Sequence, residues 1–245
     1  MCMETLEKIR KAYTEFVLDN GQQPPSVYQF AKKLKLPEAE FYNYYSSFDS
    51  IEADIWLAFF QDAQKTVEAD ETYQTYSVRE KLLAFYYTWI ELLKAQRSFV
   101  VYSYGRVRGQ MQAGGDPIAP VGMGGVARPV SRIAMARMRS GGGMAGGNRT
   151  LYPFKDAFLD FARDLLAEGR ESREVEQRPF ITTRYPDALW LQTMYILDFW
   201  VKDVSKSFEQ TDTAIEKSVN TAFDLIGRSP LDSVIDLAKF IYQNK

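Results

Sequence analysis

The stretch from Pro37 to Tyr45 gathers side chains that could recognise another molecule through hydrogen bonds and flat aromatic surfaces. Phe41, Tyr42 and Tyr44 crowd a predicted helix that is too short to be a core element by itself. A short, aromatic-rich helix that follows a tight turn is the usual form of a recognition helix presented to a DNA groove. The sequence therefore predicts binding chemistry here, directed at nucleic acid.

Catalytic chemistry has little support in this sequence. The chain contains no histidine and a single cysteine, Cys2. This composition excludes Ser-His-Asp and Cys-His nucleophiles, imidazole-dependent zinc sites and thiolate clusters. We expect neither an enzyme nor a cofactor or metal site. Two groups of carboxylates lie close together in the sequence, and we expect both on a solvated helix face or loop. The first group is Asp49 and Glu52, and the second is Glu171, Glu174 and Glu176.

Two short helices must position the recognition stretch. Ser26 is a good N-cap, and Phe30, Ala31 and Leu34 share one face of the helix that follows it. The small side chain of Ala31 lets two helices cross closely. Pro37 suits the first turn of the next helix, where a missing N–H costs nothing. This arrangement predicts a helix-turn-helix.

The pattern resembles the DNA-binding domain of TetR-family transcriptional regulators. In that family a Ser or Thr caps the second helix, as Ser26 would, and a small residue lies within it, as Ala31 does. A hydrophobic-Tyr-x-(Tyr/His)-(Phe/Tyr) run is matched from Phe41 to Tyr45. The fourth helix opens near a small polar residue and acidic residues, matched by Ser47, Asp49 and Glu52.

The resemblance implies an all-α, two-domain, homodimeric regulator. We call residues 1–47 the reading head, expected to bind double-stranded operator DNA, and expect residues 48–245 to form a helical regulatory and dimerisation domain. The family implies a repressor that a small-molecule effector releases by changing the spacing of the two heads. The residues expected to face DNA are Ser26, Gln29, Lys35, Glu38, Ala39, Glu40, Tyr42, Asn43 and Tyr44.

Departures from the family pattern favour a rival hypothesis. Lys35 stands where the turn usually carries Gly, and Phe48 stands where a phosphate-binding Lys usually opens the fourth helix. Glu38 and Glu40 take positions that usually face the groove. Six basic and six acidic residues up to Ser46 leave the reading head without the positive charge that phosphate binding uses. The rival is a TetR-like protein-interaction module that has lost operator binding, and a carrier for an apolar molecule is a third hypothesis.

Hydrophobic spacing predicts helices at about 3–19, 48–67, 77–95, 97–104, 151–168, 186–204, 211–226 and 230–243. The family uses the space between helices of the regulatory domain as an effector pocket, which implies a small apolar effector. Packing of the same side chains in an ordinary core is the alternative. The residues expected to line the pocket are Phe85, Trp89, Phe158, Phe161, Trp190 and Met194.

The last helices also predict a homodimer. The 186–204 helix is apolar nearly all round, which is more than one small domain can cover. The family pairs two such C-terminal helices from each subunit in a four-helix bundle, so that the two heads reach successive major grooves. Packing only within the monomer is the alternative. The residues expected at the interface are Tyr195, Phe199, Ile215, Val219, Phe223 and Ile226.

An atypical insertion is predicted from Gly105 to Thr150. It contains 12 of the 15 glycines and seven arginines, against the single acidic residue Asp116. We expect it on the surface with little regular structure. Three interpretations stay open: a flexible Gly/Ala/Arg linker, a stretch translated in a shifted frame, and an arginine-rich segment that adds affinity for nucleic acid.

Composition agrees with a globular protein. Hydrophobic residues make up 46% of the 245 residues and aromatic residues 14%. Charges appear from Glu4 onward, so no secretory segment is expected, and no apolar run is long enough to span a membrane. The single cysteine suits a reducing compartment. We therefore expect a cytoplasmic protein without a membrane partner.

Overall fold

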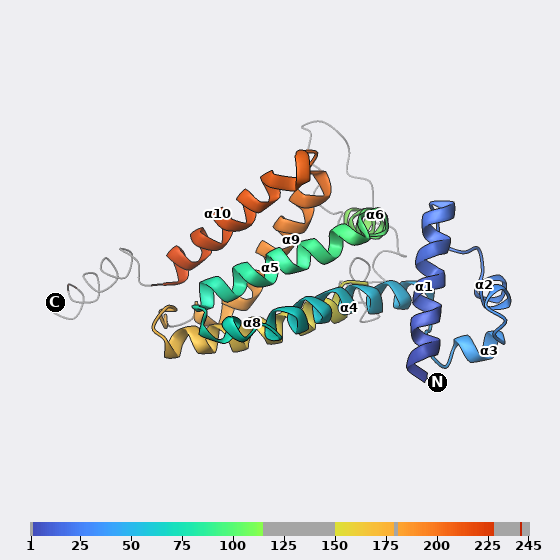
Figure 1. The fold of residues 1–245 in the computed structure, drawn as a ribbon, viewed down its shortest axis with the longest axis horizontal. Helices are drawn as coiled ribbons and strands as arrows, with labels where there is room; N and C mark the ends of the chain where they lie inside the picture. The colour runs from blue at the N-terminus through green and yellow to red at the C-terminus, as the bar shows by residue number, and fades with distance from the viewer. Residues whose placement is uncertain (1, 115–149, 179–180, 228–240, 242–245) are drawn as a thin grey trace, which may run out of the picture. The chain divides into compact units, whose positions relative to one another are not determined.

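The computed structural model describes residues 2–114, 150–178, 181–227 and 241 (Figure 1). Over these ranges the chain forms helices and no strand, so the predicted all-α fold is confirmed. None of the helices described there combines the length and hydropathy that crossing a membrane requires. The α-helices are α1 (Cys2–Asn20), α2 (Val27–Lys33), α3 (Glu38–Phe41), α4 (Phe48–Glu68), α5 (Val78–Ala95), α6 (Arg97–Gly114), α8 (Tyr152–Glu171), α9 (Tyr185–Lys202) and α10 (Glu209–Ile226), with 3-10 turns at Glu71–Thr75, Thr182–Arg184 and Lys206–Phe208.

These helices belong to two compact units. Unit 1 comprises residues 1–56 and 96–153, and unit 2 comprises residues 57–95 and 154–245. Helix α4 therefore begins in unit 1 and ends in unit 2, whereas α6 belongs with the N-terminal helices. The predicted boundary between residues 47 and 48 separates the residues expected to bind DNA from the regulatory domain, and it stays a prediction. The helix predicted at 230–243 falls, apart from residue 241, outside the described residues.

An aromatic core holds the reading head together in unit 1. The ring of Tyr13 stacks on Phe48 with 5.7 Å between centroids and meets Phe30 edge-on at 6.3 Å. Phe41 packs edge-on against both Phe30, at 6.2 Å, and Phe48, at 6.1 Å. Ala31 is 1% exposed within the same helix pair. Phe48, which replaces the lysine of the family pattern, thus helps to build the core behind α2 and α3.

Helix α6 continues past Gly105, where the insertion was predicted to begin, as far as Gly114. The expectation of little regular structure is therefore wrong for residues 105–114. The reason is packing: Val107 is 1% exposed and Arg106 is partly buried, so buried contacts offset the weak helix propensity of the glycines. Residues 115–149, the larger part of the predicted insertion, lie outside the described residues.

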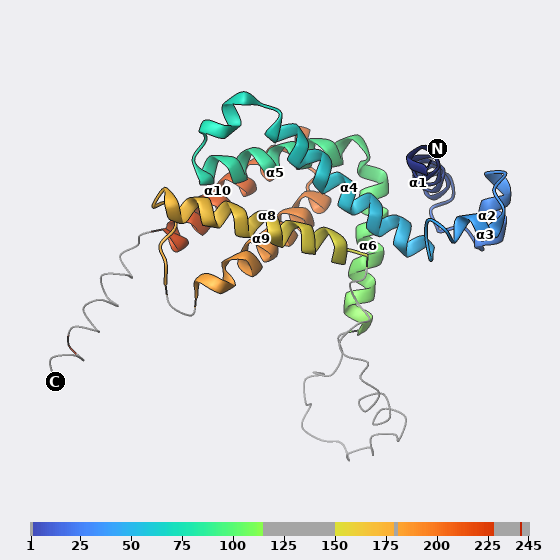
Figure 2. The same cartoon turned by 90° about the horizontal axis from the view of Figure 1, so that it is seen from below.

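Unit 2 contains the end of α4 together with α5, α8, α9 and α10 (Figure 2). Helix α10 packs along both α5 and α9. The apolar stripe of α10 faces this interior, since Ile215 and Val219 are 0% exposed and Phe223 is 2% exposed. A salt bridge of 2.5 Å between Lys81 on α5 and Glu168 on α8 also joins two helices of the unit.

Candidate nucleic-acid interface and regulatory sites

The turn between α2 and α3 is built by local hydrogen bonds. The side chain of Ser26 caps α2 and accepts from the backbone N–H of Gln29 at 3.2 Å, as predicted. The backbone N–H of Leu36 returns to the carbonyl of Ala31 at 3.0 Å. Between them Lys35 has φ of 58°, a left-handed conformation that glycine favours. The lysine therefore adopts the backbone shape of the family's glycine and adds a charged side chain there.

Helix α3 is a single turn that begins after Pro37 and ends at Phe41. Phe41 is 0% exposed and anchors the turn, whereas Tyr42 directly after it is 52% exposed. The α2–α3 surface thus presents most of the residues predicted to face DNA. Gln29, Lys35, Glu38, Ala39, Tyr42 and Asn43 are exposed, and Ser26, Glu40 and Tyr44 are partly buried.

The charges of this surface are mixed. The ammonium group of Lys32 lies 6.0 Å from the ring centroid of Tyr28, which is itself exposed, and that of Lys33 lies 4.8 Å from the centroid of Phe16. On α3 the hydroxyl of Tyr42 donates to the carboxylate of Glu38 at 3.4 Å. The surface therefore offers aromatic and hydrogen-bonding groups beside a balanced set of charges.

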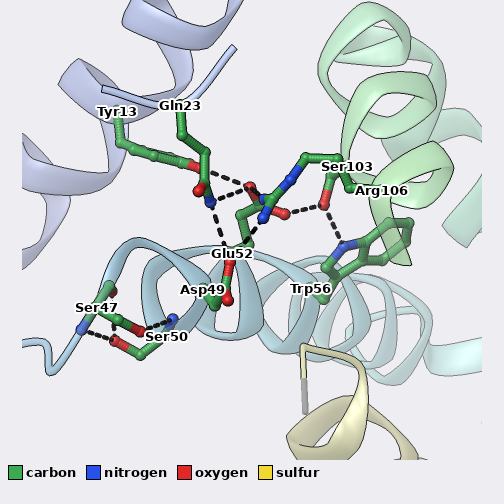
Figure 3. A network of polar contacts seen from close by, with 9 residues as sticks. All are labelled: Tyr13, Gln23, Ser47, Asp49, Ser50, Glu52, Trp56, Ser103 and Arg106. Atoms are coloured by element: carbon green, nitrogen blue, oxygen red, sulfur yellow. Dashed lines mark hydrogen bonds and ion pairs between the residues drawn. The ribbon is translucent and has the colours of Figure 1, made fainter. Parts of the chain in front are cut away.

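A polar network centred on Glu52 joins α1, α4 and α6 in unit 1 (Figure 3). The carboxylate of Glu52 accepts from the hydroxyl of Tyr13 at 2.5 Å and from the hydroxyl of Ser103 at 2.7 Å. Arg106 donates to Glu52 at 2.5 Å and to Asp49 at 2.9 Å. We call these residues, with Gln23 and Trp56, the Glu52 network. The side-chain amide of Gln23 points between the two carboxylates, and the indole of Trp56 donates to Ser103 at 3.0 Å.

The expectation that Asp49 and Glu52 lie on a solvated face is wrong for Glu52, which is 0% exposed. Burial, together with the charge of Glu52 and the hydrogen bond to it, raises the pKa of the Tyr13 phenol far above its ordinary value. For Arg106, burial opposes the charge, but the hydrogen bond to Asp49 and the charges of Glu52 and Asp49 outweigh it and raise its pKa. The network therefore keeps Tyr13 protonated and Arg106 charged.

The residues predicted to bind an effector come together in unit 2 as an aromatic cluster. We use this name for Phe60, Phe85, Trp89, Phe154, Phe158, Phe161 and Trp190, whose neighbouring ring centroids lie between 5.0 and 6.4 Å apart. Phe85, Trp89 and Phe158 are 0% exposed. The sixth predicted residue, Met194, is partly buried on α9. Direct packing of these rings is core-like, so a bound molecule must separate them.

One polar atom in the aromatic cluster stands out. The indole N–H of Trp89 is buried, and it meets no hydrogen-bond acceptor among the residues that the structure describes. Such a buried donor is costly when it is left unpaired. A bound molecule that offered an acceptor there would remove this cost.

An apolar groove lies between α9 and α10. It has a volume of about 760 Å³. Three residues predicted at the dimer interface, Tyr195, Phe199 and Ile226, line it. The other three, Ile215, Val219 and Phe223, are buried in the interior of unit 2, where α10 packs along α5 and α9. The remaining groove residues are Tyr185, Ala188, Leu189, Gln192, Gln210, Thr213, Ala214, Lys217, Ser218, Thr221, Ala222 and Leu225.

A second hollow of about 790 Å³ lies between α8 and the start of α9, and it is basic. Arg163, Arg170 and Arg178 all contribute to its wall. Arg178 is held in place because its guanidinium donates to the hydroxyl of Tyr185 at 3.0 Å and to the carbonyl of Gly227 at 2.7 Å. This hollow does not have the apolar character that the sequence predicts for an effector site.

Comparison with known families bears on the C-terminal helices. Residues 143–241 match the family described as tetracyclin repressor-like, C-terminal domain. This range contains all of α8, α9 and α10. No curated protein sequence matches the chain. The all-helical chain therefore carries a TetR-like C-terminal domain over residues 143–241.

Proposed function

We propose that this protein is a homodimeric transcriptional regulator, which binds operator DNA through α2 and α3 and acts as a repressor that a small effector releases. The observation that carries the proposal is the exposed α2–α3 surface. It presents Tyr42, Asn43, Gln29 and Lys35 over a buried aromatic core, in a chain whose C-terminal domain is TetR-like. A rigid element that exposes several polar side chains is suited to reading base edges.

The chemistry of these side chains assigns them different tasks. The amide of Asn43 can donate and accept at once, which matches the major-groove edge of adenine. Lys35 lies in the turn and is suited to a phosphate oxygen. Glu38 can accept from the amino group of cytosine, which gives selectivity but no general affinity. We therefore expect a binding preference that is set more by base contacts than by charge.

We further propose that the α9–α10 groove is the dimer interface. The groove is mainly apolar, and Tyr195 and Leu225 beside it are 52% and 56% exposed. Within it the side-chain oxygen of Gln192 is buried and has no hydrogen-bond partner among the described residues. A second copy of α9 and α10 would cover the apolar side chains and could supply a donor for this oxygen, in the two-fold arrangement usual for homodimers.

The aromatic cluster supports the proposed effector site. Its rings pack against one another within unit 2, and the unpaired indole N–H of Trp89 would select a ligand with an acceptor atom. An apolar molecule with one carbonyl, ether or hydroxyl oxygen fits these requirements. Its binding would push rings apart and change the packing of α4, α5 and α8.

The protein-interaction module stays the second candidate, and particular residues favour it. Glu38 is exposed on the single turn of α3, and Phe48 fills the core where a phosphate-binding lysine is usual. Glu38→Lys distinguishes the candidates, because it should raise the non-specific affinity for DNA and steepen its salt dependence if DNA is the ligand. If the ligand is instead a protein that recognises the acidic side chain of Glu38, the same substitution should abolish its binding.

Alanine variants of the exposed tyrosine and asparagine test the DNA-binding proposal directly. Tyr42→Ala and Asn43→Ala should each weaken binding to a selected operator by about 1–3 kcal/mol, because base contacts of this kind are lost. Fluorescence anisotropy with labelled duplexes measures the change. Tyr152→Ala is the matched control, since Tyr152 is 65% exposed but lies on α8. Equal affinity of all three variants and the wild type would contradict the proposed interface.

A further inference from the structure

Three helices that are distant in sequence meet at Glu52 in unit 1 (Figure 3). Tyr13 reaches it from α1 and Ser103 reaches it from α6. Arg106, also on α6, places a cation 2.5 Å from the same carboxylate. A carboxylate that is 0% exposed is strongly unfavourable once its counter-charge is removed. The position of α6 is therefore tied to the positions of α1 and α4.

Arg106 is suited to this task by the shape of its side chain. One nitrogen of the guanidinium binds Glu52 and the other binds Asp49 at 2.9 Å, so that it spans two carboxylates one turn apart on α4. A lysine offers a single point charge and cannot reproduce such a fork. The Arg106 side chain is 26% exposed and that of Glu52 is 0% exposed, which limits the screening of this ion pair by water.

Tyr13 extends the Glu52 network to the helix-turn-helix. Its hydroxyl belongs to the network, while its ring stacks on Phe48 and contacts Phe30 of α2. Phe30 in turn packs on Phe41, the buried anchor of α3. A continuous set of described contacts thus runs from Arg106 on α6 to the single turn that carries Tyr42.

We infer that Arg106 is a positioning residue for the reading head, and that selective DNA binding depends on its contact with Asp49 and Glu52. The inference rests on the proposed DNA-binding function. Arg106 fixes α6 against α4 and, through Glu52 and Tyr13, fixes the core on which α2 and α3 sit. When this contact is lost, the DNA-facing side chains stay on the surface, but α2 and α3, which carry them, are held less firmly.

The first arm of the test does not depend on DNA. The double variant Glu52→Gln with Arg106→Met removes both charges, so that no charge is left buried without a partner. Hydrogen exchange of the Trp56 indole N–H, which donates to Ser103 on α6, reports the seating of that helix. It should quicken by about tenfold or more in the variant. An unchanged exchange rate would show that the ion pair does not hold α6, and would overturn the inference.

An exposed ion pair in unit 2 supplies the matched control. Arg79 and Asp224 lie 2.9 Å apart, like Arg106 and Asp49, but both have well exposed side chains. Arg79→Met with Asp224→Asn should leave the exchange of the Trp56 indole unchanged. An equal acceleration in this control would mean that global loosening causes the effect, and would contradict a positioning role for Arg106.

The second arm measures binding to a selected operator and to a scrambled duplex. In the Glu52→Gln, Arg106→Met variant the Kd for the operator should rise about tenfold, whereas that for the scrambled duplex should change less than about twofold. Arg106→Lys should lie between this variant and the wild type. Faster exchange with unchanged operator selectivity would overturn the positioning role and leave the proposed function intact. A wild type that prefers no duplex would instead overturn the proposed function and, with it, the role in selectivity.

Discussion

Lys35 combines two properties that one substitution can separate. Its backbone adopts φ of 58°, a conformation that costs a non-glycine residue about 1–2 kcal/mol. Its exposed ammonium group is proposed to contact a phosphate. Lys35→Gly should therefore raise the free energy of unfolding by about 0.5–1 kcal/mol. The gain is smaller than the strain that is removed, because glycine has a larger conformational entropy in the unfolded chain. The same change should weaken DNA binding.

Urea unfolding and anisotropy on one protein preparation measure both effects of Lys35→Gly. Lys32→Gly is the control, since Lys32 is exposed within α2 and a glycine there should lower the free energy of unfolding by about 1 kcal/mol. If Lys35→Gly destabilised the protein as much as Lys32→Gly, the left-handed conformation of Lys35 would be wrong.

Tyr86 makes stability depend on alkaline pH. Burial raises the pKa of its phenol above the ordinary value of 10.0, and the hydrogen bond with Thr193 offsets this only in part. Below pH 10 folded and unfolded states both keep the proton, so the full stability is present. Above that pH the unfolded state loses a proton that the folded state retains, and the free energy of unfolding should fall by about 1.4 kcal/mol per pH unit for such a tyrosine.

Tyr86→Phe removes this proton, so its stability should decline less steeply than that of the wild type in urea unfolding between about pH 9 and 11. Tyr28→Phe, at a position that is 57% exposed, should decline as steeply as the wild type. Identical slopes for all three proteins would show that the phenol of Tyr86 is accessible to water in the folded state.

At the residue scale, the sequence predicted the exposed α2–α3 side chains better than the buried polar ones. The spacing of Phe30, Ala31 and Phe41 is local, and local periodicity predicted which side chains turn inward. Glu52 was assigned to solvent because its partners Ser103 and Arg106 are about fifty positions away in the chain. The available signal was weak: its neighbours Ile51 and Ile55 are apolar, which places Glu52 next to a buried face.

At the scale of helices, the dimer proposal depends on the α9–α10 groove. Tyr195→Glu places a charge on an apolar surface that a partner subunit would bury, so it should shift the protein from dimer to monomer at micromolar concentration while leaving the helices folded. Sedimentation velocity and circular dichroism measure the two effects. Leu191→Glu is the control, because Leu191 is 68% exposed on α9 but does not line the groove. A wild type that sediments as a monomer would contradict the proposed interface.

Phe223 illustrates why an apolar stripe alone does not identify an interface. It is 2% exposed and lies in the interior of unit 2, where α10 packs along α5 and α9. Phe223→Glu should therefore unfold unit 2 rather than yield a folded monomer. The spacing of Ile215, Val219 and Phe223 predicted an apolar face correctly, but periodicity does not say whether a helix of the same chain or of a partner covers it.

At the scale of the whole molecule, helix order in the sequence does not match the compact units. Helix α6 follows α5 directly, yet it packs with α1 and the start of α4. The all-α fold and most helix positions could be predicted because they follow from local spacing. The pairing of α6 with the reading head could not, because it depends on contacts such as that between Arg106 and Glu52, which no local pattern reveals.

Selection of bound fragments from the genomic DNA of the source organism, at a fixed salt concentration, tests the central claim most directly. We predict that the wild-type chain enriches a palindrome whose half-sites lie about one helical turn apart, and that the Tyr42→Ala, Asn43→Ala double variant enriches none. Salt near the physiological value suppresses non-specific binding. If the wild type recovers genomic fragments uniformly, without a shared sequence, the result would contradict operator binding and favour the protein-interaction module.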